Sequence, residues 1–179
     1  RRVMIVPPIW LILIACMVFF SLAAENFLAL NNFTNILIQT STIGLIALGM
    51  TVVMINGNID LSVGAVVALA ASLSVGMQDQ LGILPAVAVG LGSGMALGFL
   101  NGVIVWKTGV DAFIVTLGAM IGVRGLVFLY TKEQSFFSMN FAYADFGMSS
   151  LAGVPTLAIV FIAFTAIMHW LMTSTTHGR

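Results

Sequence analysis

The sequence has very few charged residues. Only 7% of its 179 residues are Asp, Glu, Lys or Arg, whereas 60% are hydrophobic, and the formal net charge is zero. A soluble domain carries about 25% charged residues, so this chain lacks the charge that would keep its surface in water. A net charge of zero also gives no sign of the basic surface that binds nucleic acid. The composition therefore indicates an integral membrane protein.

Cysteine and catalytic motifs are equally scarce. Cys16 is the only cysteine, which excludes an intramolecular disulfide and a thiolate metal site. The sequence contains no Walker-type phosphate-binding loop and no complete Gly-x-Ser-x-Gly motif. His169 and His177 stand eight residues apart with no nearby carboxylate, which is a poor metal-binding pattern. We therefore expect no catalytic residues and no metal site here, and any ATP hydrolysis would take place on another chain.

The N-terminus has some features of a bacterial lipoprotein signal. Arg1 and Arg2 precede an apolar stretch that reaches Cys16. The apolar run continues to Phe20, whereas a lipoprotein becomes polar after its cysteine. We interpret the stretch as an anchoring first span. Because the chain begins with Arg rather than Met, we expect a fragment of a longer protein.

Long apolar runs predict an all-α fold, a polytopic transmembrane helix bundle with about six membrane segments. The expected segments are residues 5–24, 36–55, 61–77, 83–106, 113–130 and 154–172. The second is twenty residues, or about 30 Å of helix, which matches the hydrocarbon thickness of a bilayer. The third is shorter than a comfortable span.

The distribution of positive charge predicts the orientation. With six crossings and a cytoplasmic N-terminus, Arg1, Arg2, Lys107 and Arg179 all lie on the cytoplasmic side, and only Lys132 lies outside. Cytoplasmic loops are enriched in Lys and Arg. We therefore expect both ends of the chain to be cytoplasmic, which requires the chain to reverse between the second and third segments.

A polar interruption at residues 56–60 provides that reversal as a broken or re-entrant helix turn. It contributes the candidate residues Asn56, Asn58, Asp60 and, just beyond, Ser62. Asp60 is well placed to cap the following helix, since a carboxylate accepts hydrogen bonds from the free amides of a helix start. Irregular backbone at membrane depth also persists only where it is buried in protein or lines a watery cavity. Transporters use such breaks around the substrate path, and the two roles are compatible.

Three further polar residues lie within apolar segments, where they are costly and therefore candidates for function. Asn101 and Thr116 each form part of the candidate polar core, or only hydrogen-bond a neighbouring helix. Arg124 either reaches the outer surface near Tyr130 or pairs with Asp60 or with backbone carbonyl groups. We favour a structural pairing role over a role in binding substrate.

Glycine recurs every four residues along the fourth segment, at Gly90, Gly94, Gly98 and Gly102. Small residues at this spacing let helices approach closely in lipid, so we expect a packing surface.

An aromatic-rich segment at residues 131–150 is expected outside the membrane. Its five aromatic residues are Phe136, Phe137, Phe141, Tyr143 and Phe146. They form either a docking surface or an amphipathic segment at the membrane interface.

Three ordered motifs resemble the permease subunits of ribose/galactose/arabinose/xylose-type bacterial ABC importers. They are GMTVVMINGNIDLSVGA at residues 49–65, GFLNG at 98–102, and FIVTLGAM at 113–120 followed by Arg124-Gly125. Asn58 replaces the second glycine of a usual Gly-Gly pair, and asparagine is the next best residue for a left-handed backbone. Residues 109–111 replace a proline-containing turn of the family.

The resemblance implies the N-terminal half of a permease that moves a monosaccharide or small polyol across the bacterial inner membrane. Its partners would be a cytoplasmic ATPase carrying ATP and Mg, a periplasmic sugar-binding protein, and a second permease copy or homologue. The whole of residues 1–179 would be one transmembrane domain that stops before the ATPase-coupling helix. The alternatives are a secondary transporter or channel, for which Asp60 is the only convincing membrane acid, an intramembrane enzyme, and an inactive fragment.

Overall fold

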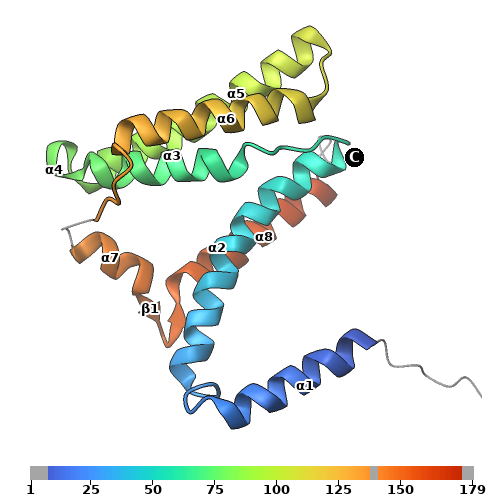
Figure 1. Cartoon of the computed structure of the whole chain (residues 1–179), viewed down its shortest axis with the longest axis vertical. Coiled ribbons are helices and arrows are strands. Elements are labelled where there is room, and N and C mark those ends of the chain that lie inside the picture. Colours follow the sequence, from blue (N-terminus) through green and yellow to red (C-terminus); the bar gives the residue numbers. More distant parts are fainter. Residues whose placement is uncertain (1–7, 138–140, 175–179) are drawn as a thin grey trace, which may run out of the picture.

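The computed structural model describes residues 8–137 and 141–174, which are almost entirely helical (Figure 1). The helices and strands are α1 (Pro8–Ala23), α2 (Leu30–Ile55), α3 (Val63–Gly76), α4 (Gln78–Leu81), α5 (Ile83–Thr108), α6 (Ala112–Thr131), α7 (Phe141–Met148), β1 (Ser150–Leu151), β2 (Val154–Pro155) and α8 (Thr156–Ser174). The predicted all-α class is confirmed.

Four of these helices, α2, α5, α6 and α8, are long and apolar enough to cross a membrane. The apolar helices α1 and α3 are shorter, at 16 and 14 residues. Every predicted segment thus corresponds to one helix, but a count of six full crossings stays a prediction. The polar loop expected before the second segment is shorter than predicted, because α2 already begins at Leu30 and Thr34 donates its hydroxyl hydrogen bond to the Leu30 carbonyl.

Helices α3, α5 and α6 pack together as one layer (Figure 1). Their shared core contains Ala65 and Leu69 of α3 and Val123 of α6. At Gly90 the backbones of α3 and α5 approach so closely that a Cβ atom on Gly90 would lie 2.5 Å from the Ala70 carbonyl oxygen. This glycine therefore makes the α3–α5 contact possible.

Helices α2 and α8 form a second layer and run side by side in the same direction (Figure 1). Gly44 of α2 lies against the Phe161 ring of α8. Further along, Ile55 and Met172, near the ends of the two helices, line the same groove. The ends of α2 and α8 consequently point the same way, as expected if both cross towards the same side.

A short hairpin connects α7 to α8. Strands β1 and β2 pair antiparallel with Leu151 opposite Val154, and the turn between them places Ala152 and Gly153 at positive φ. The Ser149 and Thr156 hydroxyl groups, 2.7 Å apart, close its base. This hairpin and α4 are too short to be recognised from hydropathy.

Candidate functional site

The break between α2 and α3 is a turn built on glycine. Helix α2 ends at Asn56, whose side-chain amide donates to the Val52 carbonyl at 2.8 Å. Gly57 follows with φ of 76°, a left-handed conformation that glycine adopts without steric cost. Asn58 does not have a positive φ, so the left-handed backbone considered for it is not needed. The Asn58 side chain donates to the Asn56 carbonyl at 3.3 Å.

Asp60 fixes the approach to α3. Its Oδ1 accepts two hydrogen bonds from Ser62, one from the backbone N–H at 2.7 Å and one from the hydroxyl at 2.6 Å. Ser62 is itself the N-cap of α3, and its carbonyl accepts the Val66 N–H at 2.9 Å. The capping prediction for Asp60 is therefore modified. Its carboxylate holds the capping residue, which lies just before the helix, and accepts no bond from within α3.

Two neighbouring helices hold the same turn from the side. Asn101 of α5 donates from Nδ2 to the Ser62 hydroxyl oxygen at 3.1 Å. Thr116 of α6 accepts the Leu61 N–H at 3.1 Å and donates to its own helix at the Ala112 carbonyl, 2.7 Å away. The side chains of Ser62, Asn101 and Thr116 are buried. The Leu61 backbone N–H and the Ser62 hydroxyl group at the break thus bond to side chains 55 and 39 positions further along the chain, respectively.

A hollow of about 280 Å³ opens beside this network. Four of the predicted polar residues line it: Asn58, Asp60, Asn101 and Thr116. Its remaining wall is made by the following residues: Val53, Ile59, Gly98, Gly102, Val105, Trp106 and Ala112. Two side-chain oxygens, Oδ2 of Asp60 and Oδ1 of Asn101, make no hydrogen bond within the described residues. They remain available to a bound molecule.

The glycines of α5 divide into two groups. A Cβ on Gly90 would collide with α3, and one on Gly94 would lie 3.4 Å from a Val66 methyl group, so these two face the packing contact. Gly98 and Gly102 have no atom within 4 Å of the Cβ position and line the hollow instead. The packing role predicted for the whole ridge therefore applies to its first half, and the second half leaves open space.

The hollow lies below the end of its helices. Asn101 precedes the last residue of α5, Thr108, by seven positions, which is about 10 Å along a helix. Helix α3 has 14 residues and is about 21 Å long, less than the roughly 30 Å of a hydrocarbon core. The short length of α3 supports a turn at membrane depth, where irregular backbone must be enclosed by protein or line a cavity. Residues 56–59 are exposed, and Asn58 and Ile59 line the hollow.

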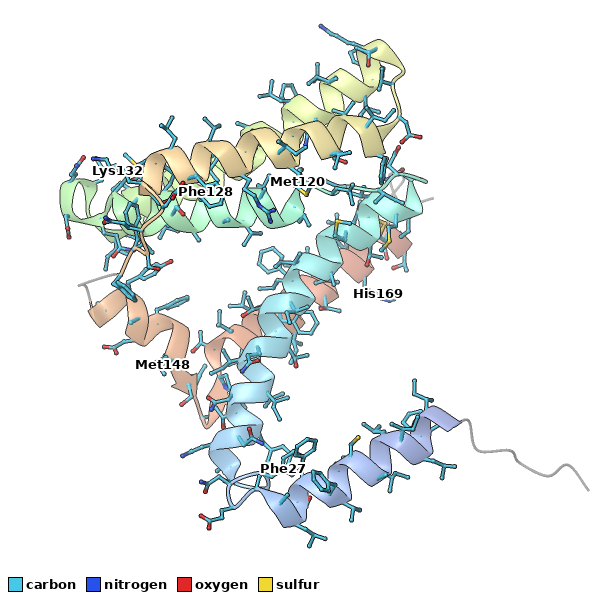
Figure 2. All side chains as sticks on the ribbon, in the orientation of Figure 1. Phe27, Met120, Phe128, Lys132, Met148 and His169 are labelled. Carbon is cyan, nitrogen blue, oxygen red and sulfur yellow. The ribbon has the colours of Figure 1, made fainter. Side chains whose placement is uncertain are left out.

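Arg124 and Asn56 do not join this site. Arg124 is exposed on α6, two helical turns beyond Thr116, and makes no ion pair with Asp60 or any other described residue. It lines a separate hollow between Met120 and Phe128, which Figure 2 labels along α6. Asn56 is exposed, and its side chain bonds only to its own helix.

The remaining polar candidates show no metal or catalytic grouping. No cluster of three His, Cys, Asp or Glu side chains occurs among residues 8–137 and 141–174. His169 is exposed in the groove between α2 and α8 (Figure 2), and His177 lies outside the described residues. Of the aromatic residues in the 131–150 segment, Phe136, Phe137 and Phe146 are exposed, and the Phe136 ring packs edge-on against Tyr130 with the centroids 5.5 Å apart.

Trp106 is the residue of the hollow that sequence reasoning missed. It lies in the last turn of α5, and in the sequence this position indicated only the end of a membrane segment. In the structure its side chain is 79% exposed. A usable signal was present, because Gly98, Asn101, Gly102 and Val105 follow the i, i+3, i+4, i+7 spacing of one helix face. That pattern marks the wall of the hollow directly.

Comparison with known proteins assigns the chain to a family. Residues 32–179 match the family described as "Branched-chain amino acid transport system / permease component". The chain belongs to this permease family. The permease chain is 38% identical over 158 residues to the ribose import permease protein RbsC of Escherichia coli (strain K12), covering 83% of the chain and 49% of that protein.

Other relatives are also sugar permeases. The D-allose transport system permease protein AlsC of Escherichia coli (strain K12) is 34% identical, covering 88% of the permease chain and 48% of AlsC. The galactofuranose transporter permease protein YtfT of the same organism is 37% identical, covering 79% and 42%. The resemblance to sugar importer permeases is confirmed, and the chain spans about half the length of these relatives. No solved structure gives a significant match.

Proposed function

We propose that this chain forms part of the translocation path of an ATP-driven importer for a monosaccharide or a related small polyol. The observation that carries the proposal is the hollow at the broken turn, where amide, carboxylate and hydroxyl groups meet. Named relatives that import ribose, allose and galactofuranose support the same class of substrate.

The chemistry of the hollow suits a neutral polyol. Asn58, Asn101 and Thr116 supply uncharged hydrogen-bonding groups, and Asp60 is the only ionisable residue of the wall. A sugar hydroxyl both donates and accepts, so that a mixed set of amide and carboxylate oxygens pairs with it directly. Trp106 offers an apolar ring face beside these groups, and ligand sites commonly combine aromatic walls with a few placed polar groups.

Transport by this route requires other chains. Because the sequence has no phosphate-binding loop, ATP and Mg would be bound by a cytoplasmic ATPase. A periplasmic binding protein would deliver the sugar, and a second permease copy or homologue would complete the path. We place the chain in the bacterial inner membrane with a cytoplasmic N-terminus, an orientation that puts Lys107 and the hollow towards the cytoplasm.

Filling the hollow tests the proposal without breaking its hydrogen bonds. Gly98→Leu and Gly102→Leu each add a side chain where nothing lies within 4 Å of the Cβ position. Gly92→Leu is the matched control, since Gly92 is equally unobstructed on the same helix but does not line the hollow. The measurement is uptake of ribose and allose by vesicles that contain the complete permease with its ATPase and binding protein.

We expect the two filling variants to lose at least about 90% of uptake, equivalent to roughly 1.4 kcal/mol in the rate-limiting barrier. The Gly92→Leu control should keep most of it. Equal uptake by all three variants would place the substrate path elsewhere. Amounts of folded permease in the membrane, measured in parallel, separate a blocked path from a failure to assemble.

A further inference from the structure

Arg124 is a cation in the middle part of a membrane-spanning helix. It comes twelve residues after the first residue of α6 and seven before the last, or about 18 Å and 10 Å along the helix. Its side chain is exposed and lines a hollow of about 350 Å³ whose other residues are Met120, Ile121, Gly125 and Phe128. The Arg124 side chain therefore lies beside apolar side chains and beside Gly125, which has no side chain to fill the hollow.

No carboxylate of this chain can neutralise that charge. All six Asp and Glu residues fall within the described residues. Asp60 lies beside Thr116, eight residues or about 12 Å along α6 from Arg124, and Asp111 is the N-cap of α6 and accepts the Phe113 N–H. Asp79 and Asp145 lie in the short helices α4 and α7, and Glu25 and Glu133 lie in connecting segments. Arg124 makes no hydrogen bond or ion pair within residues 8–137 and 141–174.

The helix direction argues against escape to the outer membrane surface. Side chains on an α-helix lean towards its N-terminus. In α6 that direction leads from Arg124 back to Met120 and Ile121, which line the same hollow, and away from Lys132 at the outer end (Figure 2). An arginine at this position would have to extend against this lean to reach lipid phosphates.

We propose that the Arg124 face of α6, defined by Met120, Ile121, Arg124, Gly125 and Phe128, binds a membrane-spanning segment that carries a carboxylate. Arginine forms two parallel hydrogen bonds with a carboxylate, and an intramembrane cation without such a partner is costly. Gly125 provides room for a close approach. This assignment does not depend on which substrate the permease carries.

The segment comes from sequence that this chain does not contain. In a second copy packed in the same orientation, Asp60 again lies at the level of Thr116, about 12 Å along α6 from Arg124, and none of the other five acidic residues lies within a long helix. The relatives are about twice as long as the matched region, which leaves about half of each for further membrane segments. The occupant of the Arg124 face is therefore a segment corresponding to that second half.

Charge reversal tests this pairing in the complete permease. Purified Arg124→Lys, Arg124→Met and Arg124→Glu variants are melted in detergent, with Lys132→Glu as a control cation at the end of the same helix. We expect the Glu variant to melt at least about 5 °C below the parent, Met to fall between, and Lys and the control to remain close to it. Each Asp and Glu in membrane segments outside residues 1–179 is then changed to Arg in the Arg124→Glu background.

One of these reversals should restore the melting temperature, and the same change in the parent should lower it. The proposal is wrong if Arg124→Met melts within about 1 °C of the parent, if no reversal restores the Glu variant, or if those segments contain no acidic residue. In that event lipid phosphate or a substrate anion is the partner. Because the readout is stability, its failure is distinct from a failure of the uptake experiment.

Discussion

Ser62 joins the two halves of the candidate site through one hydroxyl group. The hydroxyl donates to Asp60 Oδ1 at 2.6 Å and accepts from Asn101 Nδ2 at 3.1 Å. An amide oxygen at position 60 can accept the same two bonds, whereas a methyl group cannot. The hydrogen bonds that Asp60 accepts from Ser62 can therefore be tested separately from any role of its negative charge.

Replacement of Asp60 distinguishes those roles. We expect Asp60→Asn in the complete complex to keep a folded permease and measurable substrate-stimulated ATP hydrolysis. Asp60→Ala removes both bonds to Ser62, and we expect a loss of about 1–3 kcal/mol of stability, measured by thermal melting. If Asp60→Asn abolished uptake while folding and ATP hydrolysis stayed intact, a coupled ion would be the better explanation.

Thr116 makes a second residue-level prediction. Thr116→Val keeps the shape of the side chain but leaves the half-buried Leu61 N–H without its acceptor. We expect a stability loss of about 1–3 kcal/mol. Thr116→Ser retains the hydroxyl and serves as the control, so that equal melting temperatures for the two variants would contradict the assigned hydrogen bond.

At the level of elements, the sequence predicted α5, α6 and α8 to within two residues and the end of α2 correctly, but it missed the first six residues of α2 and the way in which the helices assemble. Apolar runs determine helix extent because each spans the same hydrocarbon thickness. The contacts of Ser62 with Asn101 and of Leu61 with Thr116 join positions far apart in the chain, and hydropathy carries no information on such pairs. Ser62, Asn101 and Thr116 were nevertheless candidate site residues, and Leu61 lies between two candidates, since polar groups in apolar runs are costly and attract attention.

Misjudged details of the site have local physical causes. The spacing of Gly98 and Gly102 is the same whether a helix face packs or remains open, so the pattern could not separate the two roles. Arg124 and Asp60 were the obvious opposite charges within the apolar segments, yet Asp60 lies beside Thr116, eight residues before Arg124 on α6, and bonds Ser62 through Oδ1. The turn at residues 109–111 proved regular, with Gly109 left-handed at φ of 69° and Asp111 capping α6.

The contact between α3 and α5 can be tested through its glycines. Gly90→Ala places a methyl group against the Ala70 carbonyl oxygen and the Ser74 hydroxyl, and the backbone cannot give way cheaply. We expect a stability loss of about 1–3 kcal/mol from overpacking. Gly98→Ala meets nothing and should be neutral or stabilising by up to about 1 kcal/mol, because alanine favours the helix. Thermal melting of the two variants in one detergent makes the comparison.

For the whole molecule, the two layers share a common polarity. Helices α2, α5 and α8 end on the same side of the molecule on which α3 and α6 begin (Figure 1). One end of the bundle therefore collects the turn at residues 56–62 and the α5–α6 connection. The opposite end collects α4 and the segment after α6.

Cysteine labelling tests this polarity. Cys16 is first changed to Ser, and single cysteines are then placed at Asp79, Val110 or Lys132, all exposed. We expect a membrane-impermeant maleimide added to whole cells with a permeable outer membrane to label positions 79 and 132 but not 110. Inside-out vesicles should give the reverse pattern. Labelling of 110 together with 132 from one side would contradict the assigned crossings.

The dependence of the broken turn on later helices has a consequence for biosynthesis. Ser62 leaves the ribosome 39 residues before Asn101, and Leu61 leaves 55 residues before Thr116. At about 5–20 residues per second, the turn waits roughly 3–11 s for its last partner. During that interval its polar backbone has to remain in water or in the insertion channel, since lipid offers it no hydrogen bonds. We therefore expect the turn between α2 and α3 to enter the lipid only after α6 has been synthesised.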